Sequence, residues 1–457
     1  MTEPIAITGI GLRMPSLIDS PKSLWDLITT GKSVVRKIPE EFPRKVGIPY
    51  GGVIENIRGF DPELFNIFPV EAHCMDPLQR LSLMACWDAL QHSGIDIKGI
   101  QGKSVGVFAG SSGQEYNRVE SNSSSLHPMD GTGTAGSVIA GRISYCMDFR
   151  GPAITVDTAC SSSAVAVHLA CMSLRANESD LALAGGGSLI LDDRNSTIYK
   201  KANMLSPHYR CASFREGADG FVRSEGVGFL LLKRLSDALR DSDNIVAVIK
   251  ASAMNQDGKS NGLTAPNLNA QVDVINRALD AGSIDKSSIA YIEAHGSGTS
   301  LGDTVEICAL DEVFQGSVDD IKVGSIKSQL GHTEFAAGIA GVMKAALCQH
   351  YGSIPSSLLA GEQFKPNPLI EWDEIVPSFN TTAIDIANDN SCIGVSSFGF
   401  SGTNCHIILG KSPILHRNME KPSYGFSLTD FWRDKVNTDQ PEPQGSEEID
   451  RIISEFF

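Results

Sequence analysis

The sequence lacks the long apolar runs of membrane proteins and the leader of secreted ones. No stretch of its 457 residues reaches the roughly 20 consecutive apolar side chains that a transmembrane helix needs. The first residues have no basic region followed by an apolar one, so they do not match a secretory signal. We therefore expect a cytoplasmic protein that does not enter a membrane.

Cysteine is sparse and is not arranged for a metal or for a disulfide framework. The ten cysteines form no Cys-x-x-Cys pair, and no His-Glu-x-x-His motif occurs. The glycine-rich stretches match neither a Walker loop nor a dinucleotide fingerprint, and are more simply tight turns. We expect reduced, mostly buried thiols, no metal site and no bound cofactor.

Positive charge is also in deficit. The chain has 38 basic and 54 acidic side chains, which gives a net charge of −16. Binding to a nucleic acid backbone depends on clustered lysine and arginine, so we expect no nucleic acid partner. The hydrophobic content of 42% and the charged content of 20% are typical of a folded protein with a large core.

Short apolar runs, rich in β-branched residues, recur along the first 410 residues. They lie at 5–7, 105–108, 154–156, 181–184, 228–232, 245–249, 289–292, 393–395 and 406–409. Continuous apolar runs predict strands that helices cover on both faces, which favours an α/β fold with largely parallel sheets. Two α/β halves, 1–245 and 246–411, would account for the length.

Residues 412–457 differ from the rest and predict a linker followed by a helix. Prolines and polar residues dominate up to about residue 445, whereas 446–457 repeats apolar residues at the spacing of one helical face. Two interpretations of this helix stay open. It packs on its own protein, or it docks on a partner that the linker allows it to reach.

Cys160 is the strongest candidate for a reacting group. The apolar run 154–156 ends just before it, and a small-residue helical stretch begins just after it. A thiol at such a strand-to-helix elbow faces the positive end of the helix dipole, so we expect a lowered pKa. The other nine cysteines lack this setting and are better explained as core residues.

Two histidines follow the predicted strands of the second half. His295 comes directly after the run 289–292, and His332 precedes a helical stretch of small residues. Loops at strand ends are where α/β folds place their active sites. The large separations along the chain exclude a compact metal motif and allow a Cys-His-His cluster assembled by the fold.

Several motifs together resemble those of β-ketoacyl synthases. They are DTACSSS, EAHGSGT, KSQLGHTEFAAG and GVSSFGFSGTNCH, in this order, with NQDGKSNGLTAPN and LGDTVE between them. The sequence is most similar to ketosynthase domains of modular, type I polyketide synthases, over about residues 1–411. The resemblance implies a thiolase-like fold, in which two similar α/β halves form a five-layered αβαβα body. It also implies a homodimer.

The resemblance also implies the chemistry. A ketosynthase takes an acyl chain from a phosphopantetheine thioester on an acyl carrier protein, then joins it to a malonyl-type unit with loss of CO2. Cys160 matches the nucleophile, and the backbone N–H groups of Cys160 and Phe400 would form the oxyanion hole. His295 and His332 match the histidine pair that stabilises the enolate.

Supporting residues follow from the same motifs. Lys327 matches the family lysine and is expected to orient the site electrostatically, with Glu306 as a candidate ion-pair partner. Phe398 or Phe400 would gate the acyl pocket, and Thr299 belongs to the glycine-rich loop after His295. Purely structural roles remain the stronger interpretation for Glu306 and Phe398.

The departures from the family pattern are small. Ser297 replaces a threonine, Ala164 stands where leucine is common, and Phe68 and Val70 replace a frequent serine and arginine. None removes a reacting group, so they bear on substrate fit and packing.

Other activities remain open. The alternatives are a non-elongating transacylase, a catalyst of C–O or C–N bond formation and a non-catalytic partner subunit, although the intact Cys160, His295 and His332 favour condensation. A degradative thiolase is disfavoured, because thiolases use a second catalytic cysteine. No acyltransferase or carrier-protein motif occurs, so substrates would come from separate carrier proteins or polyketide synthase modules, possible partners of the helix 446–457. We expect a free-standing protein rather than one cut from a longer chain.

Overall fold

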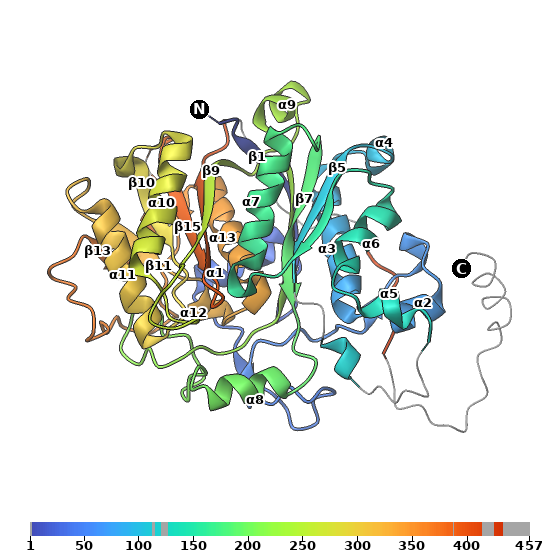
Figure 1. Cartoon of the computed structure of the whole chain (residues 1–457), viewed down its shortest axis with the longest axis horizontal. Coiled ribbons are helices and arrows are strands. Elements are labelled where there is room, and N and C mark those ends of the chain that lie inside the picture. The colour runs from blue at the N-terminus through green and yellow to red at the C-terminus, as the bar shows by residue number, and fades with distance from the viewer. Residues whose placement is uncertain (1, 112–114, 120–126, 387, 414–424, 433–457) are drawn as a thin grey trace.

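Eleven strands form one hydrogen-bonded sheet that runs through the protein (Figure 1). The computed structural model describes residues 2–111, 115–119, 127–386, 388–413 and 425–432. The strand order is β13-β11-β10-β15-β16-β9-β1-β8-β7-β5-β6. In chain order the bounds are β1 Ile5–Arg13, β5 Val105–Gly110, β6 Ala153–Val156, β7 Leu181–Ser188, β8 Gly226–Arg234, β9 Ala247–Gln256, β10 Ile289–Glu293, β11 Ile321–Gly324, β13 Pro377–Phe379, β15 Cys392–Phe398 and β16 Thr403–Gly410.

The two halves of the sheet repeat one topology. β6-β5-β7-β8-β1 and β11-β10-β15-β16-β9 have the same order relative to the chain, and β13 is added at one edge. In each half the first three strands are parallel, the fourth runs antiparallel to them, and the fifth is antiparallel to the fourth. The halves meet where β1 pairs with β9 at three positions, beginning at Ile5 and Ile249.

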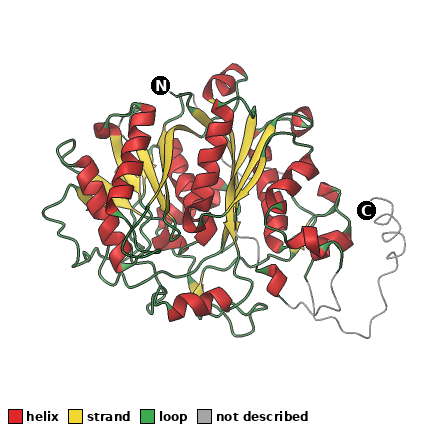
Figure 2. Ribbon diagram, viewed as in Figure 1, coloured by secondary structure: helices red, strands yellow, loops and turns green. Residues whose placement is uncertain are grey.

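Helices form three layers around the two half-sheets (Figure 2). α7 (Ser162–Arg175) and α13 (Ala337–Tyr351) contact each other and strands of both halves, so they form the central layer. α3 (Pro77–Ser93) and α6 (Val138–Met147) cover the outer face of the first half, and α10 (Leu268–Gly282) with α11 (Ser300–Phe314) covers that of the second. The arrangement is the five-layered αβαβα body.

Shorter helices and strands complete the described elements. The helices are α1 Pro21–Thr30, α2 Pro69–Cys74, α4 Ile97–Ile100, α5 Asp130–Thr134, α8 Arg194–Lys201, α9 Leu235–Arg240 and α12 Lys327–Leu330. The short strands are β2 Arg36–Lys37, β3 Tyr50–Gly51, β4 Gly59–Phe60, β12 Ser353–Ile354, β14 Ile384–Asp385 and β17 Thr429–Asp430. None of the described helices is long and apolar enough to cross a membrane.

Two expectations about the strands were wrong. The sheet is mixed and not largely parallel. The expectation failed because an apolar run indicates that both faces of a strand are covered, but not the direction of the strand. The run 154–156 is not buried, because β6 lies at the edge of the sheet, where Ile154 is 42% exposed. Every one of the nine runs nevertheless contributes to a strand.

Residues 425–432 pack on the first half, although the sequence analysis assigned them to a linker. β17 pairs with β4, and Phe431 and Trp432 are buried among aromatic residues of that half. The helix expected at 446–457 lies outside the described residues. β1 pairs with β8 of its own half and with β9 of the other half, so hydrogen bonds join the two halves into one sheet. The domain boundaries near 245 and 411 stay predictions.

Candidate active site

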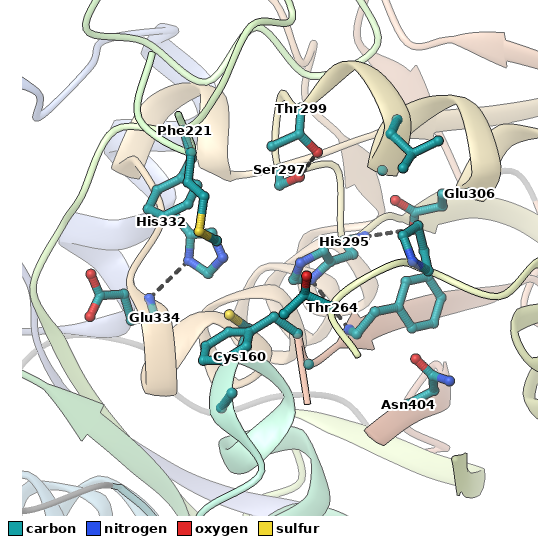
Figure 3. Close-up of a pocket in the computed structure, with 18 of the residues that line it drawn as sticks. Cys160, Phe221, Thr264, His295, Ser297, Thr299, Glu306, His332, Glu334 and Asn404 are labelled. Carbon is teal, nitrogen blue, oxygen red and sulfur yellow. Dashed lines mark hydrogen bonds between the residues drawn. The ribbon is translucent and has the colours of Figure 1, made fainter. Parts of the chain in front are cut away.

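Cys160 lies in a short 3-10 turn, Ala159–Ser161, between β6 and α7. Ala159 holds the left-handed backbone conformation, with φ of 57°, which a residue with a Cβ adopts only at a cost. Hydrogen bonds hold the turn in this shape. Thr158 N–H donates to Ser162 Oγ at 2.8 Å, and Ser397 Oγ donates to the Cys160 carbonyl at 3.1 Å. The sharp elbow points the thiol out of the central layer (Figure 3).

The electrostatics of the thiol differ from the sequence-based expectation. Burial, and then the Glu334 carboxylate, raise the pKa of Cys160 to about 12, whereas the sequence predicted a lowered value. Lys327 and the backbone N–H groups of Phe400 and Cys160 act in the opposite direction. Both N–H groups thus lie close to the sulfur.

His295 and His332 face each other across the same space (Figure 3). Their ring centroids are 5.6 Å apart and the rings are nearly perpendicular, at 79°. His295 follows β10, and His332 lies between α12 and α13. Each residue thus comes from the carboxyl side of a parallel strand, as Cys160 does after β6.

Both histidines have a defined protonation state. His295 Nδ1 accepts from the Phe398 N–H at 3.3 Å, and His332 Nδ1 accepts from the Glu334 N–H at 2.9 Å. Burial, and then the charge of Lys327, lower the pKa of both rings well below the usual value. A neutral ring whose Nδ1 accepts must carry its proton on Nε2, so both rings are hydrogen-bond donors at Nε2.

Lys327 and Glu306 hold the peptide of His295 from opposite sides. Glu306 accepts from the N–H groups of His295 and Gly296 at 2.7 and 2.8 Å, and Lys327 Nζ donates to the His295 carbonyl at 2.5 Å. Burial raises the pKa of Glu306 to about 8 and lowers that of Lys327. The charges of Lys327 and Glu306 also act on each other's pKa, and both side chains bind the backbone of His295. The pairing expected from sequence stays a prediction.

A cavity of about 400 Å³ opens onto Cys160, His295 and His332. Apolar surface makes up most of its wall, and the polar lining residues include Thr264, Asn404 and Asp257. All predicted site residues line it except Lys327, which lies behind His295. The remaining members of the predicted site on the wall are Thr299, Glu306, Phe398 and Phe400.

Sequence reasoning missed several residues of this cavity. Tyr199, Phe221, Glu334 and Phe335 line it, and Arg223 forms an ion pair with Glu334 behind it. Glu334 could have been found, because it follows His332 by two residues. Arg223 had no local signal, since only an isolated β-bridge with His332 brings it here. Among the described residues, no group of three or more His, Cys, Asp or Glu side chains could hold a metal.

Comparison with family models decides the assignment. Residues 2–238 match the β-ketoacyl synthase N-terminal domain, and residues 246–360 match the β-ketoacyl synthase C-terminal domain. The chain belongs to the β-ketoacyl synthase family. It is thus an acyltransferase-type enzyme by family.

Curated relatives are polyketide synthases. Over 426 residues, which is 90% of this chain, it is 43% identical to one component of the phenolphthiocerol/phthiocerol polyketide synthase of Mycobacterium tuberculosis. Over 431 residues it is 42% identical to another component of the same synthase. The chain spans 27% and 23% of the lengths of these relatives. The match therefore concerns one part of a much longer protein.

Solved ketosynthase structures share the fold. The ketosynthase from module 6 of the bacillaene synthase of Bacillus subtilis 168 is 38% identical with a TM-score of 0.83, over 90% of this chain and 72% of that one. An oxazolomycin ketosynthase domain of Streptomyces albus JA3453 is 32% identical, also with a TM-score of 0.83, over 92% and 75%. The thiolase-like fold is confirmed, and the chain is a ketosynthase of the polyketide synthase kind.

Proposed function

We propose that this ketosynthase loads an acyl group onto Cys160 and condenses it with a malonyl-type unit. The observation that carries the proposal is that one cavity receives a thiol with two N–H groups close to it and two neutral imidazoles that donate from Nε2. The extender and the acyl chain would both arrive as phosphopantetheine thioesters of acyl carrier proteins.

In the first step, Cys160 Sγ attacks the carbonyl carbon of the incoming thioester. The N–H groups of Cys160 and Phe400 stabilise the oxyanion that forms. The bond between the acyl carbon and the pantetheine sulfur breaks, and the Cys160 proton passes to the departing sulfur. Because burial raises its pKa to about 12, the Cys160 thiol is mostly protonated before the attack.

In the second step, the bond between the α-carbon and the carboxylate of the malonyl unit breaks and CO2 leaves. Its electron pair forms an enolate, which the Nε2–H groups of His295 and His332 stabilise on the thioester oxygen. The α-carbon then attacks the Cys160 thioester, and the sulfur of Cys160 departs. Lys327 and Glu306 act as positioning residues for His295, through its carbonyl and its N–H.

The carrier protein would reach the cavity over a basic rim. Lys200 and Lys201 on α8 are exposed and adjoin the lining residues Tyr199 and Ala202, and Lys259 is exposed beside Asp257. On a protein of net charge −16, these cations suit the phosphate of the pantetheine arm. The helix 446–457 is proposed as a further contact with the carrier protein or module. A cytoplasmic setting also belongs to the proposal, since Cys160 must stay reduced.

Intact-protein mass spectrometry tests the proposal. Wild type, Cys160→Ala, His295→Ala and the control Cys308→Ser, an exposed thiol, receive a short acyl-pantetheine thioester and then malonyl carrier protein. We expect one acyl group on wild type and on the control, none on Cys160→Ala, and a β-ketoacyl product with CO2 release that His295→Ala does not form. Loading followed only by hydrolysis or transfer would identify a non-elongating enzyme. Absence of loading would contradict the proposal.

A further inference from the structure

A buried ion pair, formed by Arg223 and Glu334, lies directly behind His332. Arg223 Nε donates to Glu334 Oε1 at 2.5 Å, and Nη2 donates to Oε2 at 3.0 Å. The Arg223 side chain is fully buried, and that of Glu334 is 7% exposed. The desolvation cost of a buried ion pair offsets its electrostatic attraction, so stability alone does not explain this pair. Its position behind His332 indicates a role in the site.

Glu334 holds an unusual backbone conformation. Its φ is 49°, in the left-handed region that glycine adopts freely and that other residues adopt at a cost. In this conformation its N–H donates to His332 Nδ1 at 2.9 Å. That bond decides which nitrogen of His332 carries the proton. The left-handed backbone of Glu334 therefore keeps the His332 proton on Nε2.

Arg223 is itself fixed relative to His332. His332 N–H donates to the Val222 carbonyl at 2.8 Å, and Ser224 N–H donates to the His332 carbonyl at 2.9 Å. These bonds flank Arg223 on both sides. Its guanidinium also donates to Ser196 Oγ at 2.6 Å and lies 5.3 Å from the centre of the Tyr199 ring.

The contacts form a closed ring. It runs from the His332 backbone to the backbone at 222–224, through the Arg223 side chain to the Glu334 carboxylate, and through the Glu334 backbone N–H back to the His332 imidazole. We propose that Arg223 and Glu334 are positioning residues, whose ion pair holds the Glu334 backbone so that His332 presents Nε2–H to the substrate. This inference rests on the proposed condensation.

Substitution of Glu334 by alanine and by glycine separates the two roles of the side chain. Both variants remove the Glu334 carboxylate from Arg223, which keeps Glu115 at 4.0 Å, but only glycine adopts the left-handed backbone without the pair. We expect Glu334→Ala to release CO2 from malonyl carrier protein about tenfold more slowly than Glu334→Gly. Loading of Cys160 does not use His332, and both variants remove the same carboxylate, which raises the Cys160 pKa. Loading should therefore change equally in both variants and by less than about threefold.

Glu225 supplies a matched control. It forms a buried ion pair with Arg44, away from the cavity, and its backbone is not left-handed. Glu225→Gly should therefore be no better than Glu225→Ala in any assay. Correlation spectra of ¹⁵N-histidine protein give a second readout. The His332 signal, assigned with His332→Gln, should show Nε2–H in wild type and in Glu334→Gly, and a mixture of tautomers in Glu334→Ala.

The inference fails if the two Glu334 variants release CO2 equally slowly, or if loading falls in parallel with CO2 release. If Glu334→Ala does not fold, Arg223→Lys replaces it, since lysine keeps the charge and loses the two-point contact. Unchanged CO2 release in Arg223→Lys would also overturn it. Wild-type loading and condensation, measured first, separate these failures from failure of the proposed function.

Discussion

At the residue scale, burial and hydrogen bonding act on Cys160 in opposite directions. Burial and the Glu334 carboxylate disfavour the thiolate, while Lys327 and two backbone N–H groups favour it, and burial dominates. A thiol of this kind is protected from oxidation and alkylation at rest, because the thiolate is the reactive form. It becomes a strong nucleophile when an acyl group is in place to receive the electron pair.

The pH dependence of alkylation tests this balance. With a pKa of about 12, the thiolate fraction of Cys160 increases about tenfold for each pH unit through pH 10, whereas a free thiol levels off near pH 9. We expect the iodoacetamide reaction of Cys160, followed by peptide mass spectrometry, to accelerate without a plateau between pH 7 and 10. Glutathione, a free thiol, provides the comparison in the same buffer, because desolvation also raises the pKa of Cys308. A plateau for Cys160 below pH 9 would show that the helix dipole dominates instead.

The reacting residues could be predicted from sequence, but their supports could not. Cys160, His295 and His332 lie in short motifs next to strands, so their neighbours along the chain identify them. Arg223 reaches the site only through an isolated β-bridge with His332. The sequence named Lys327 and Glu306 as candidate partners, but not that both side chains bind the His295 backbone between them. A single sequence does not show which backbone or side-chain group a buried charged residue will bind.

At the scale of elements, the close contact between α7 and α13 explains a departure from the family pattern. Ala164 on α7 lies against Gly338 on α13, where an added Cβ would come within 2.7 Å of Ala164. A leucine at 164 would require the two central helices to separate. The turn that holds Cys160 leads into α7, and His332 lies shortly before α13, so the spacing of these helices affects the distance between thiol and imidazole.

Gly338→Ala should therefore destabilise the protein. The added methyl forces α7 and α13 apart, and such overpacking costs about 1–3 kcal/mol. Urea unfolding measures the change. Gly141 in α6 has no atom within 4 Å of its added Cβ, so Gly141→Ala should instead stabilise the protein by about 0.5–1 kcal/mol. Equal effects of the two substitutions would contradict the proposed contact.

The segment 425–432 is a second element whose contribution can be measured. Trp432 is 8% exposed and its ring lies 5.6 Å from that of Tyr116, while the Arg80 guanidinium donates to the Phe431 carbonyl at 2.7 Å. Trp432→Ala should lower the free energy of unfolding by about 3 kcal/mol. Leu428→Ala, at a residue 49% exposed in the same segment, is the control and should change it little. A negligible effect of Trp432→Ala would mean that the segment is not bound to the body in solution.

The sequence predicted the location of the strands better than their direction or exposure. Nine apolar runs became strands because burial of both faces leaves a direct mark on composition. Direction depends on how the chain returns, through a helical crossover or a tight turn, and the runs themselves carry no such information. The run at 154–156 was wrongly expected to be buried, because an apolar run does not indicate whether its strand lies at the edge of the sheet.

At the scale of the whole molecule, the exposed edge at β6 points to a second copy of the chain. Among the described strands, β6 pairs on one side only, with β5. Its edge has exposed apolar neighbours, with Ile154 at 42%, Met172 at 51% and Tyr145 at 84% exposure. Unprotected apolar edge strands are uncommon in monomers, because they pair with other chains. We therefore expect the edge strands of two copies to join in a homodimer.

Ile154→Lys tests the homodimer, because a charge on the edge strand opposes pairing between two copies. We expect wild type to sediment as a dimer and Ile154→Lys to raise the dimer Kd by at least about tenfold. Leu239 on α9 has the same exposure of 42% as Ile154, so Leu239→Lys should remain a dimer. Because β6 leads directly into the Cys160 turn, Ile154→Lys should also slow acyl loading at concentrations where it is monomeric. A wild-type monomer, or a dimer unaffected by Ile154→Lys, would show that the exposed strand serves another contact.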